Sequence, residues 1–448
     1  MKDLTQGKEG KVMLQFAFPL IIGNIFQQLY NIADTIIVGK YIGTDALAAV
    51  GSSFSIVVFL TSIIIGLCMG SSTLFAHFFG AKKEALLKKS IFNSFLFIGG
   101  IALLLNILVL VFIDSILNLV HTPSIIFAPT KAYLVIIFWG MSFTFLYNYF
   151  ASLLRALGNS FTPLIFLIIS ALINIVLDLV FIIIFKWGIS GAALATIIAQ
   201  GISALLCIIY CFIKVPLLRF QLNDLKLDIV LLKEIINYSV LTSIQQSIMN
   251  FGILMIQGLV NTFGVAVMAA FAAAVKIDAF AYMPAQDFGN AFSIYMAQNK
   301  GANKPLRMKR GIKVACSIST IFCILASACV LIFSTNLLTL FIPKNQLQII
   351  QYGKEYLWIV ASFYILIGYL FLFYGYYRGI GQTNISVVLT VISLGLRVVL
   401  AYICAPLFGV RAIWWAIPIG WFIADIVGLY LYLYFRFNKR KNSNSLTL

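Results

Sequence analysis

The sequence predicts an all-α polytopic membrane protein with twelve transmembrane helices, on three observations. The chain is 62% hydrophobic and only 10% charged. Its apolar residues form continuous runs, such as 12–38 and 163–185, which are long enough to cross about 30 Å of hydrocarbon at about 1.5 Å per residue. They lack the alternating segments of a membrane barrel, so helices are left to satisfy the backbone in lipid.

Twelve such runs follow one another along the chain. They cover approximately 12–38, 47–75, 91–113, 126–152, 163–185, 189–213, 236–260, 266–298, 314–335, 353–377, 383–408 and 412–435. The stretch MKDLTQGKEGK before the first run carries mixed charge, so we expect no cleaved signal peptide. The seven cysteines lie in or beside these runs, where a thiol behaves as a small apolar group.

The net charge of +17 is explained by topology. With a cytoplasmic N-terminus, most of the 31 Lys and Arg residues fall in cytoplasmic loops. The outer side receives only Lys40, Lys131, Lys186, Lys344, Lys354 and Arg411. This positive-inside bias predicts a multi-pass protein of the cell inner (plasma) membrane with both termini cytoplasmic. We expect the lipid bilayer, and no nucleic acid, as its macromolecular surroundings.

An internal repeat divides the chain into two halves. IGTDALAA at 42–49 resembles FGVAVMAA at 263–270, and LRALGNS at 154–160 resembles YRGIGQT at 377–383, at offsets of 221 and 223 residues. Each half holds an even number of spans, so both halves cross the membrane in the same direction. The repeat predicts two six-helix lobes related by a pseudo-twofold axis along the membrane normal.

The repeat also predicts the domain boundaries. We expect an N-lobe at 1–213, a cytoplasmic inter-lobe linker at 214–235, a C-lobe at 236–435 and a cytoplasmic tail at 436–448. Two such lobes would enclose a central cavity that opens to either side by rocking.

Intramembrane polar residues are the candidate functional residues, because a buried charge must be justified by a partner or a function. Asp34 shares a helical face with Gln27, Tyr30 and Asn31. Asp178 lies one turn after Asn174 on the fifth run. Counting from Lys40 and Lys186 places the two carboxylates within about 3 Å of the same depth.

Thr196 on the sixth run falls at a similar level. We therefore expect Asp34, Asn174, Asp178 and Thr196 to form one polar cluster. Two carboxylates in a low-dielectric site would take up a proton or attract a small cation such as Na⁺, which makes a coupling-ion site. The alternative is that each aspartate only forms packing hydrogen bonds.

The second half carries a different set of polar residues. Lys276, Asp278, Tyr282 and Asp287 lie on one predicted helix, which Pro284 should kink. Lys276 could neutralise Asp278, or the two aspartates could line a substrate cavity. Arg397 and Asp425 could form an interhelical ion pair, which is a structural interpretation. The run 236–260 adds Gln245, Gln246 and Asn250 to the candidate cavity residues.

No nucleotide-binding, metal-ligand or nucleophile–base motif occurs, so we expect no enzyme activity and no cofactor. The coupling ion, H⁺ or Na⁺, would supply the energy. Pro19 interrupts the hydrogen bonding of the first run and could act as a hinge or make a static kink.

The chain resembles the multidrug and toxic compound extrusion (MATE) family, in the bacterial branch with an N-lobe aspartate pair. The matching pieces include PLIIGNIFQQLYNIADTIIVGKYIGTDALAAVG, RALGNSFTPLIFLIISALINIVLDLVFI and KIDAFAYMPAQDFGNAFSIYMAQNKGA. The resemblance implies a V-shaped antiporter that exports amphipathic, often cationic compounds against Na⁺ or H⁺. It implies that the coupling ion binds at the aspartate pair Asp34 and Asp178, with Asn174 and Thr196 beside them. It also implies that the first helix bends near Pro19. The seventh run lacks the carboxylate of the family's other branch.

The leading hypothesis is therefore export of a small-molecule cargo coupled to an ion, by a protein expected to be monomeric. The alternative is a flippase for a lipid-linked saccharide or cell-wall precursor, whose polyanionic cargo would require several intramembrane Arg or Lys residues. Only Lys276 and Arg397 are available. A third possibility is a passive channel.

Overall fold

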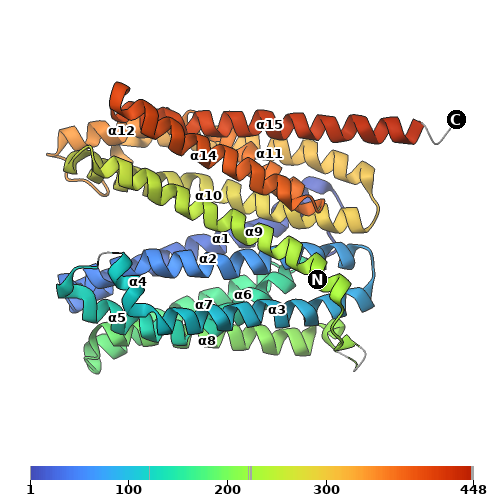
Figure 1. The fold of residues 1–448 in the computed structure, drawn as a ribbon, viewed down its shortest axis with the longest axis horizontal. Coiled ribbons are helices and arrows are strands. Elements are labelled where there is room, and N and C mark those ends of the chain that lie inside the picture. Colours follow the sequence, from blue (N-terminus) through green and yellow to red (C-terminus); the bar gives the residue numbers. More distant parts are fainter. Residues whose placement is uncertain (1, 121, 220, 222–223, 445–448) are drawn as a thin grey trace. The chain divides into compact units, whose positions relative to one another are not determined.

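The computed structural model describes residues 2–120, 122–219, 221 and 224–444, and the side chains of 253–254 and 437–444 are not described. Within these residues every regular element is helical (Figure 1), as predicted. The first half contains α1 (Glu9–Tyr41), α2 (Thr44–Gly80), α3 (Glu84–Val111), α4 (Ile113–Leu119), α5 (Ser124–Trp139), α6 (Met141–Ala156), α7 (Phe161–Leu179), a π-helical turn (Val180–Ile184), α8 (Gly188–Lys214) and a 3-10 turn (Pro216–Leu218).

The second half repeats this order. It contains α9 (Ile229–Asn261), α10 (Val265–Gly301), α11 (Pro305–Leu338), α12 (Leu347–Ala361), α13 (Tyr364–Gly379), α14 (Thr383–Phe408) and α15 (Val410–Asn444). Among the described residues, ten helices are long and apolar enough to cross a membrane, and two bent pairs raise the number to twelve when each pair is one span.

The two bent pairs are a difference from the predicted continuous spans 126–152 and 353–377. α5 and α6 meet at 45°, and α12 and α13 meet at 52°. Gly140 separates the first pair, and a side-chain carbon there would come within 2.3 Å of Ile197 on α8. The close approach of α8 therefore explains why this break carries glycine.

The backbone confirms the internal repeat. Residues with positive φ recur in pairs 221 to 223 positions apart. The pairs are Gly43 and Gly264, Lys82 and Asn303, Gly158 and Gly381, and Gly188 and Gly409. Lys82 and Asn303, at φ 56° and 51°, show that even non-glycine residues adopt the left-handed conformation at equivalent turns.

Two compact units do not coincide with the two sequence halves. Met1–Ser247 and Ala297–Pro305 form the first unit, and Ile248–Met296 with Leu306–Leu448 form the second. The chain thus passes between units three times, inside α9, inside α10 and at the start of α11. The expected tail from 436 onward continues α15 to Asn444, and 445–448 lie outside the described residues.

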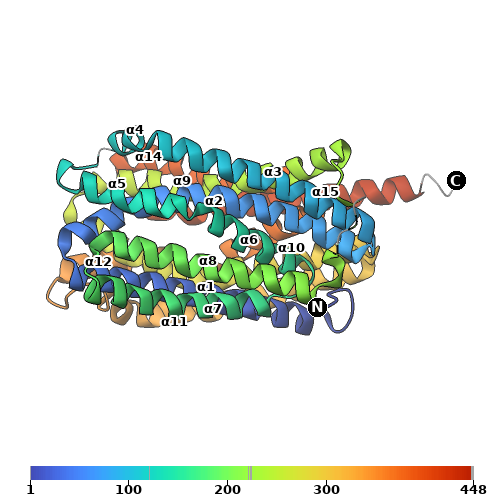
Figure 2. The same cartoon turned by 90° about the horizontal axis from the view of Figure 1, so that it is seen from below.

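Each unit has its own helix packing. In the first unit α1 packs on α7, and α7 packs on α8 (Figure 2). α2 contacts α3, α5 and α6 in the same unit. In the second unit α15 packs on α12, α13 and α14. The α1–α7–α8 layer carries the polar residues predicted for the first half.

Candidate functional site

Asp34 of α1 and Asp178 of α7 face each other in the first unit. Their carboxyl groups interact with each other electrostatically. Asp178 is fully buried, and Asp34 is 9% exposed. Two ionised carboxylates in a buried site repel each other, which favours uptake of a proton or binding of a cation by the pair.

Asn174 and Thr196 complete the cluster. The Asn174 Nδ2 donates to Thr196 Oγ1 over 3.4 Å, and the Thr196 hydroxyl donates to the carbonyl of Ala192 over 3.1 Å. These two hydrogen bonds use the Asn174 amide and the Thr196 hydroxyl as donors, and oxygen acceptors of the cluster stay without a hydrogen bond. Four buried oxygens have no hydrogen-bond partner, namely Asn174 Oδ1, Asp34 Oδ1 and both carboxylate oxygens of Asp178.

The set of donor atoms fits a proton or a hard monovalent cation. Every unpartnered atom in the cluster is oxygen, the ligand that hard cations prefer. No group of three or more His, Cys, Asp or Glu that could hold a metal occurs in the described part of the chain. A cation here would therefore depend on the two carboxylates together with the Asn174 amide and the Thr196 hydroxyl.

The polar stripe predicted on α1 divides in the structure. Tyr30 lies within electrostatic reach of both Asp34 and Asp178. Asn31 instead donates to Gln28 Oε1 over 3.3 Å, and Gln27 is exposed. Only Tyr30 and Asp34 of this stripe belong to the cluster.

The backbone changes immediately after Asp178. α7 ends at Leu179, and the next five residues form a π-helical turn, Val180–Ile184. Such a turn is wider than an α-helical turn and occurs frequently at functional sites. Ile182 of this turn packs with Ile37, Val38 and Tyr133 in an apolar cluster. This cluster bounds the carboxylate pair with residues that offer no counter-charge.

The second unit surrounds Asp278 differently. The Tyr356 hydroxyl donates to Asp278 Oδ2 over 3.1 Å, and Tyr364 also interacts with this carboxyl group. Arg397 of α14 lies within electrostatic reach of Asp278, and Tyr282 lies beside both. Both charges are buried, at 5% and 8% exposure.

Two pairings considered from the sequence are wrong. Lys276 is exposed and lies over the ring of Phe341 at 5.8 Å, so it does not neutralise Asp278. Arg397 interacts with Asp278 rather than Asp425, whose two carboxylate oxygens have no hydrogen-bond partner.

The remaining candidate cavity residues lie apart from these clusters. Asp287 is buried nine residues after Asp278 on α10, about 13 Å along the helix, and α10 continues through Pro284. In the first unit Gln245 is buried, and Gln246 Nε2 donates to Met69 Sδ over 3.8 Å. Asn250 is half-buried in the second unit.

A family model described as MatE matches residues 19–180 and 239–403. The chain belongs to the MatE family. The match covers both halves of the repeat and includes Asp34, Asn174 and Asp178. Members of this family are transporters, so the chain is a transporter and not an enzyme.

This MatE protein is similar to characterised and solved relatives over most of its length. It is 30% identical over 393 residues to the probable multidrug resistance protein YpnP of Bacillus subtilis (strain 168), with 87% of each chain covered. It is 26% identical to the multidrug export protein MepA of Staphylococcus aureus (strain NCTC 8325 / PS 47), with 91% and 90% covered. A crystal structure of MATE in complex with MaL6 matches its fold with a TM-score of 0.91 at 24% identity, covering 98% of this chain and 99% of that one.

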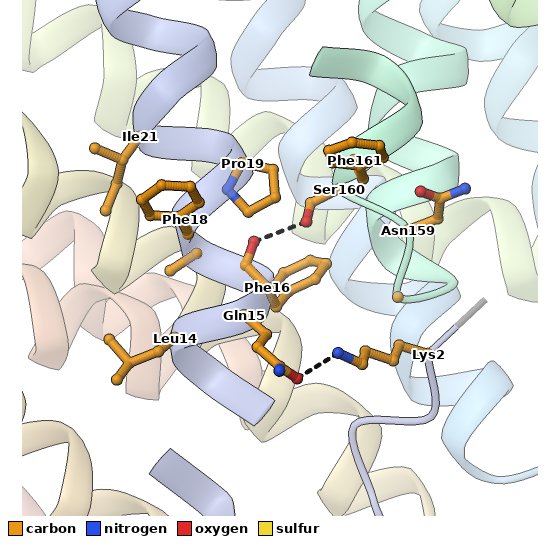
Figure 3. A pocket seen from close by; sticks show the side chains of 12 residues that line it. Lys2, Leu14, Gln15, Phe16, Phe18, Pro19, Ile21, Asn159, Ser160 and Phe161 are labelled. Atoms are coloured by element: carbon orange, nitrogen blue, oxygen red, sulfur yellow. Dashed lines mark hydrogen bonds between the residues drawn. The ribbon is translucent and has the colours of Figure 1, made fainter. Parts of the chain in front are cut away.

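Pro19 of the MatE protein lines an open cavity of about 840 Å³ between α1 and the start of α7 (Figure 3). Proline removes the hydrogen bond that the carbonyl of Gln15 would accept. Beside it, Ser160 Oγ donates to the carbonyl of Phe16 over 2.8 Å. The helix continues through Pro19, so the hinge role stays a prediction.

Sequence reasoning missed one residue of the MatE carboxylate cluster. Tyr133 of α5 is buried and lies within electrostatic reach of Asp34, Asp178 and Tyr30. Within two turns of Tyr133 its run offers only Thr130 and Lys131 as polar residues and no carboxylate or amide, so no acidic or amide stripe marks it. Its only sequence signal is a tyrosine inside a predicted span.

Proposed function

We propose that this protein is a secondary active antiporter that exports amphipathic, cationic organic compounds in exchange for H⁺ or Na⁺. The carboxylate pair of Asp34 and Asp178 carries this proposal. The pair is buried, three of its four carboxylate oxygens lack donors, and no arginine or lysine within the cluster compensates it. It therefore has to take its counter-charge from a mobile ion.

The exchange follows from this need for a counter-charge. An ion bound at Asp34 and Asp178 neutralises the pair, and its departure leaves negative charge that favours a cationic cargo nearby. Asn174 and Thr196 would bind Na⁺ through their oxygens, or would orient the carboxylates that share a proton. Gln27, Tyr30 and Asn31 on α1 would meet the cargo, with Gln245, Gln246, Asn250, Asp278, Tyr282 and Asp287 as further cargo contacts.

Alternating access would move the two units relative to each other, and the motion would involve the helices that cross between them, which are α9, α10 and the start of α11. Pro19 would act as a hinge in α1. The basic loops support an orientation with both termini in the cytoplasm, in the plasma membrane. We propose that a monomer suffices and that no cofactor is needed.

Proteoliposomes test this function directly. The purified protein should move a dye such as ethidium against its gradient when either an imposed pH gradient or an imposed Na⁺ gradient is present, and a response to only one gradient identifies the ion. Dye flux that ignores both gradients would indicate a passive channel and would contradict antiport. Protein-free liposomes are the control.

A further inference from the structure

The segment before α1, residues 2–7, is held in place although it precedes the first membrane span. Leu4 is fully buried, and Thr5 is 7% exposed. Terminal residues are usually poorly ordered unless specific contacts hold them. We name this segment the N-terminal latch. Contacts with other segments must offset the conformational entropy that it loses on ordering.

Its main partners lie at the end of α10. The Leu4 amide donates to Gln298 Oε1 over 3.0 Å, and Asn299 Nδ2 donates to the Leu4 carbonyl over 3.3 Å. Lys304 Nζ donates to the Thr5 carbonyl over 2.8 Å and to its hydroxyl over 3.1 Å. Because Gln298 and Asn299 are both fully buried, these bonds are shielded from water.

Hydrogen bonds within the latch fix its conformation. The Thr5 amide and the Gln6 side chain each donate to the Asp3 carboxylate over 2.8 Å. Partial burial raises the pKa of Asp3, but hydrogen bonds from Thr5 and Gln6 and the charge of Lys304 outweigh it and bring the pKa below its usual value. Asp3 is therefore ionised at neutral pH.

The latch also reaches the loop that follows α6. The Lys2 amide donates to the Gly158 carbonyl over 3.3 Å. Gln298 Nε2 donates to the Ala156 carbonyl over 2.8 Å, so one glutamine joins the latch, α10 and α6. Lys2 Nζ also donates to Gln15 Oε1 of α1 (Figure 3).

Beneath the latch, the ends of α2 and α10 touch through their backbones. A side-chain carbon on Gly80 would lie 2.0 Å from the Gln298 carbonyl oxygen, and one on Gly301 would lie 2.0 Å from the His77 carbonyl oxygen. Gly80 and Gly301 are equivalent in the repeat, as are His77 and Gln298. The contact is therefore reciprocal, as a twofold relation requires.

We propose that the N-terminal latch locks the end of α10 onto the first unit and must release once in every transport cycle. α10 belongs to the second unit up to Met296 and to the first from Ala297. In that cycle the last turns of α10 would have to leave α2 together with the rest of the helix, and Leu4 and Thr5 hold those turns in place. This inference depends on the alternating access proposed above.

A reversible crosslink tests the latch. In a background lacking the seven native cysteines, Thr5→Cys with Lys304→Cys would be joined by a short thiol-cleavable linker. Transport should slow at least about tenfold and return on reduction, since about 1.4 kcal/mol of added barrier already gives tenfold. Lys2→Cys with Gln15→Cys, joined in the same way within the first unit, is the matched control and should transport normally.

A second measurement does not depend on transport. Leu4→Asp should raise the rate at which a thiol reagent labels Asn299→Cys by about tenfold, because weakening the latch by about 1.4 kcal/mol shifts its open population that far. Lys8→Asp, an exposed position beyond the latch, should leave the rate unchanged. If the variant crosslinked between positions 5 and 304 transports as fast as the uncrosslinked one, the latch must be rejected, and the proposed antiport is unaffected. Equal labelling of both variants would overturn the latch even if the parent transports nothing.

Discussion

The two halves of this transporter bury carboxylates in opposite ways. Asp34 faces a second carboxylate, Asp178, and four oxygens of their cluster lack a donor. Asp278 faces Arg397 and accepts a hydrogen bond from Tyr356. The first cluster needs a positive counter-charge from a bound ion, whereas Arg397 supplies the counter-charge in the second.

The repeat places different residues at the equivalent positions of the two clusters. The offset of 223 that aligns LRALGNS with YRGIGQT places Arg397 opposite Asn174. In the first half a neutral amide stands beside the carboxylates, and in the second half a guanidinium occupies that place. The carboxylates also lack counterparts, since Asp178 is opposite Ala401 at the same offset and Asp278 is opposite Val57 at the offset of 221, so the two sites differ at several positions of the repeat.

The largest expected effect is on transport. Asp34→Asn and Asp178→Asn should each reduce ion-driven dye transport to the level of empty liposomes, because the remaining carboxylate lacks the second carboxylate with which it would bind the ion. Asp425→Asn is the matched control, since Asp425 is an equally buried carboxylate of the second unit, and it should transport normally. Normal coupling in both single variants would contradict the assigned ion site.

The next effect is on stability in the second half. Arg397→Met should lower the free energy of unfolding by about 3 kcal/mol, because it leaves the buried Asp278 without its counter-charge. Thermal unfolding in detergent measures the loss. Adding Asp278→Asn should recover most of it, and a double variant as unstable as the single one would show that the two charges are not coupled.

The smallest effect has the opposite sign. Asp34→Asn should raise the free energy of unfolding by about 1 kcal/mol at neutral pH and low sodium, because it removes a buried like-charge contact. Unfolding curves at several Na⁺ concentrations would sharpen the result. If Na⁺ binds the pair, the free energy of unfolding of the parent should rise with Na⁺ concentration until it reaches that of Asp34→Asn. An Asp34→Asn variant less stable than the parent would show that the Asp34–Asp178 contact is not repulsive.

Hydropathy was enough to predict the helical fold and the spans, and sequence matches at a nearly constant offset predicted the repeat. Hydropathy and helical periodicity also located the Asp34–Asp178 cluster, because both helices run the same way and depth can be counted from their ends. Partners that depend on helix rotation escaped prediction. Tyr133 joins the cluster from a third helix, and Arg397 turns toward Asp278 rather than Asp425. The span breaks at Gly140 and Ser362 depend on neighbouring helices that no local pattern reveals.

The reciprocal contact of Gly80 and Gly301 places the same steric constraint on both halves of the chain. Each glycine leaves room for the backbone of the other's helix, so a methyl group at either position would push against the same interface. Two copies of a half-length chain would make this contact twice across a true symmetry axis. The fused protein keeps the interface of such a dimer, and a scan of substitutions should find both glycines equally intolerant.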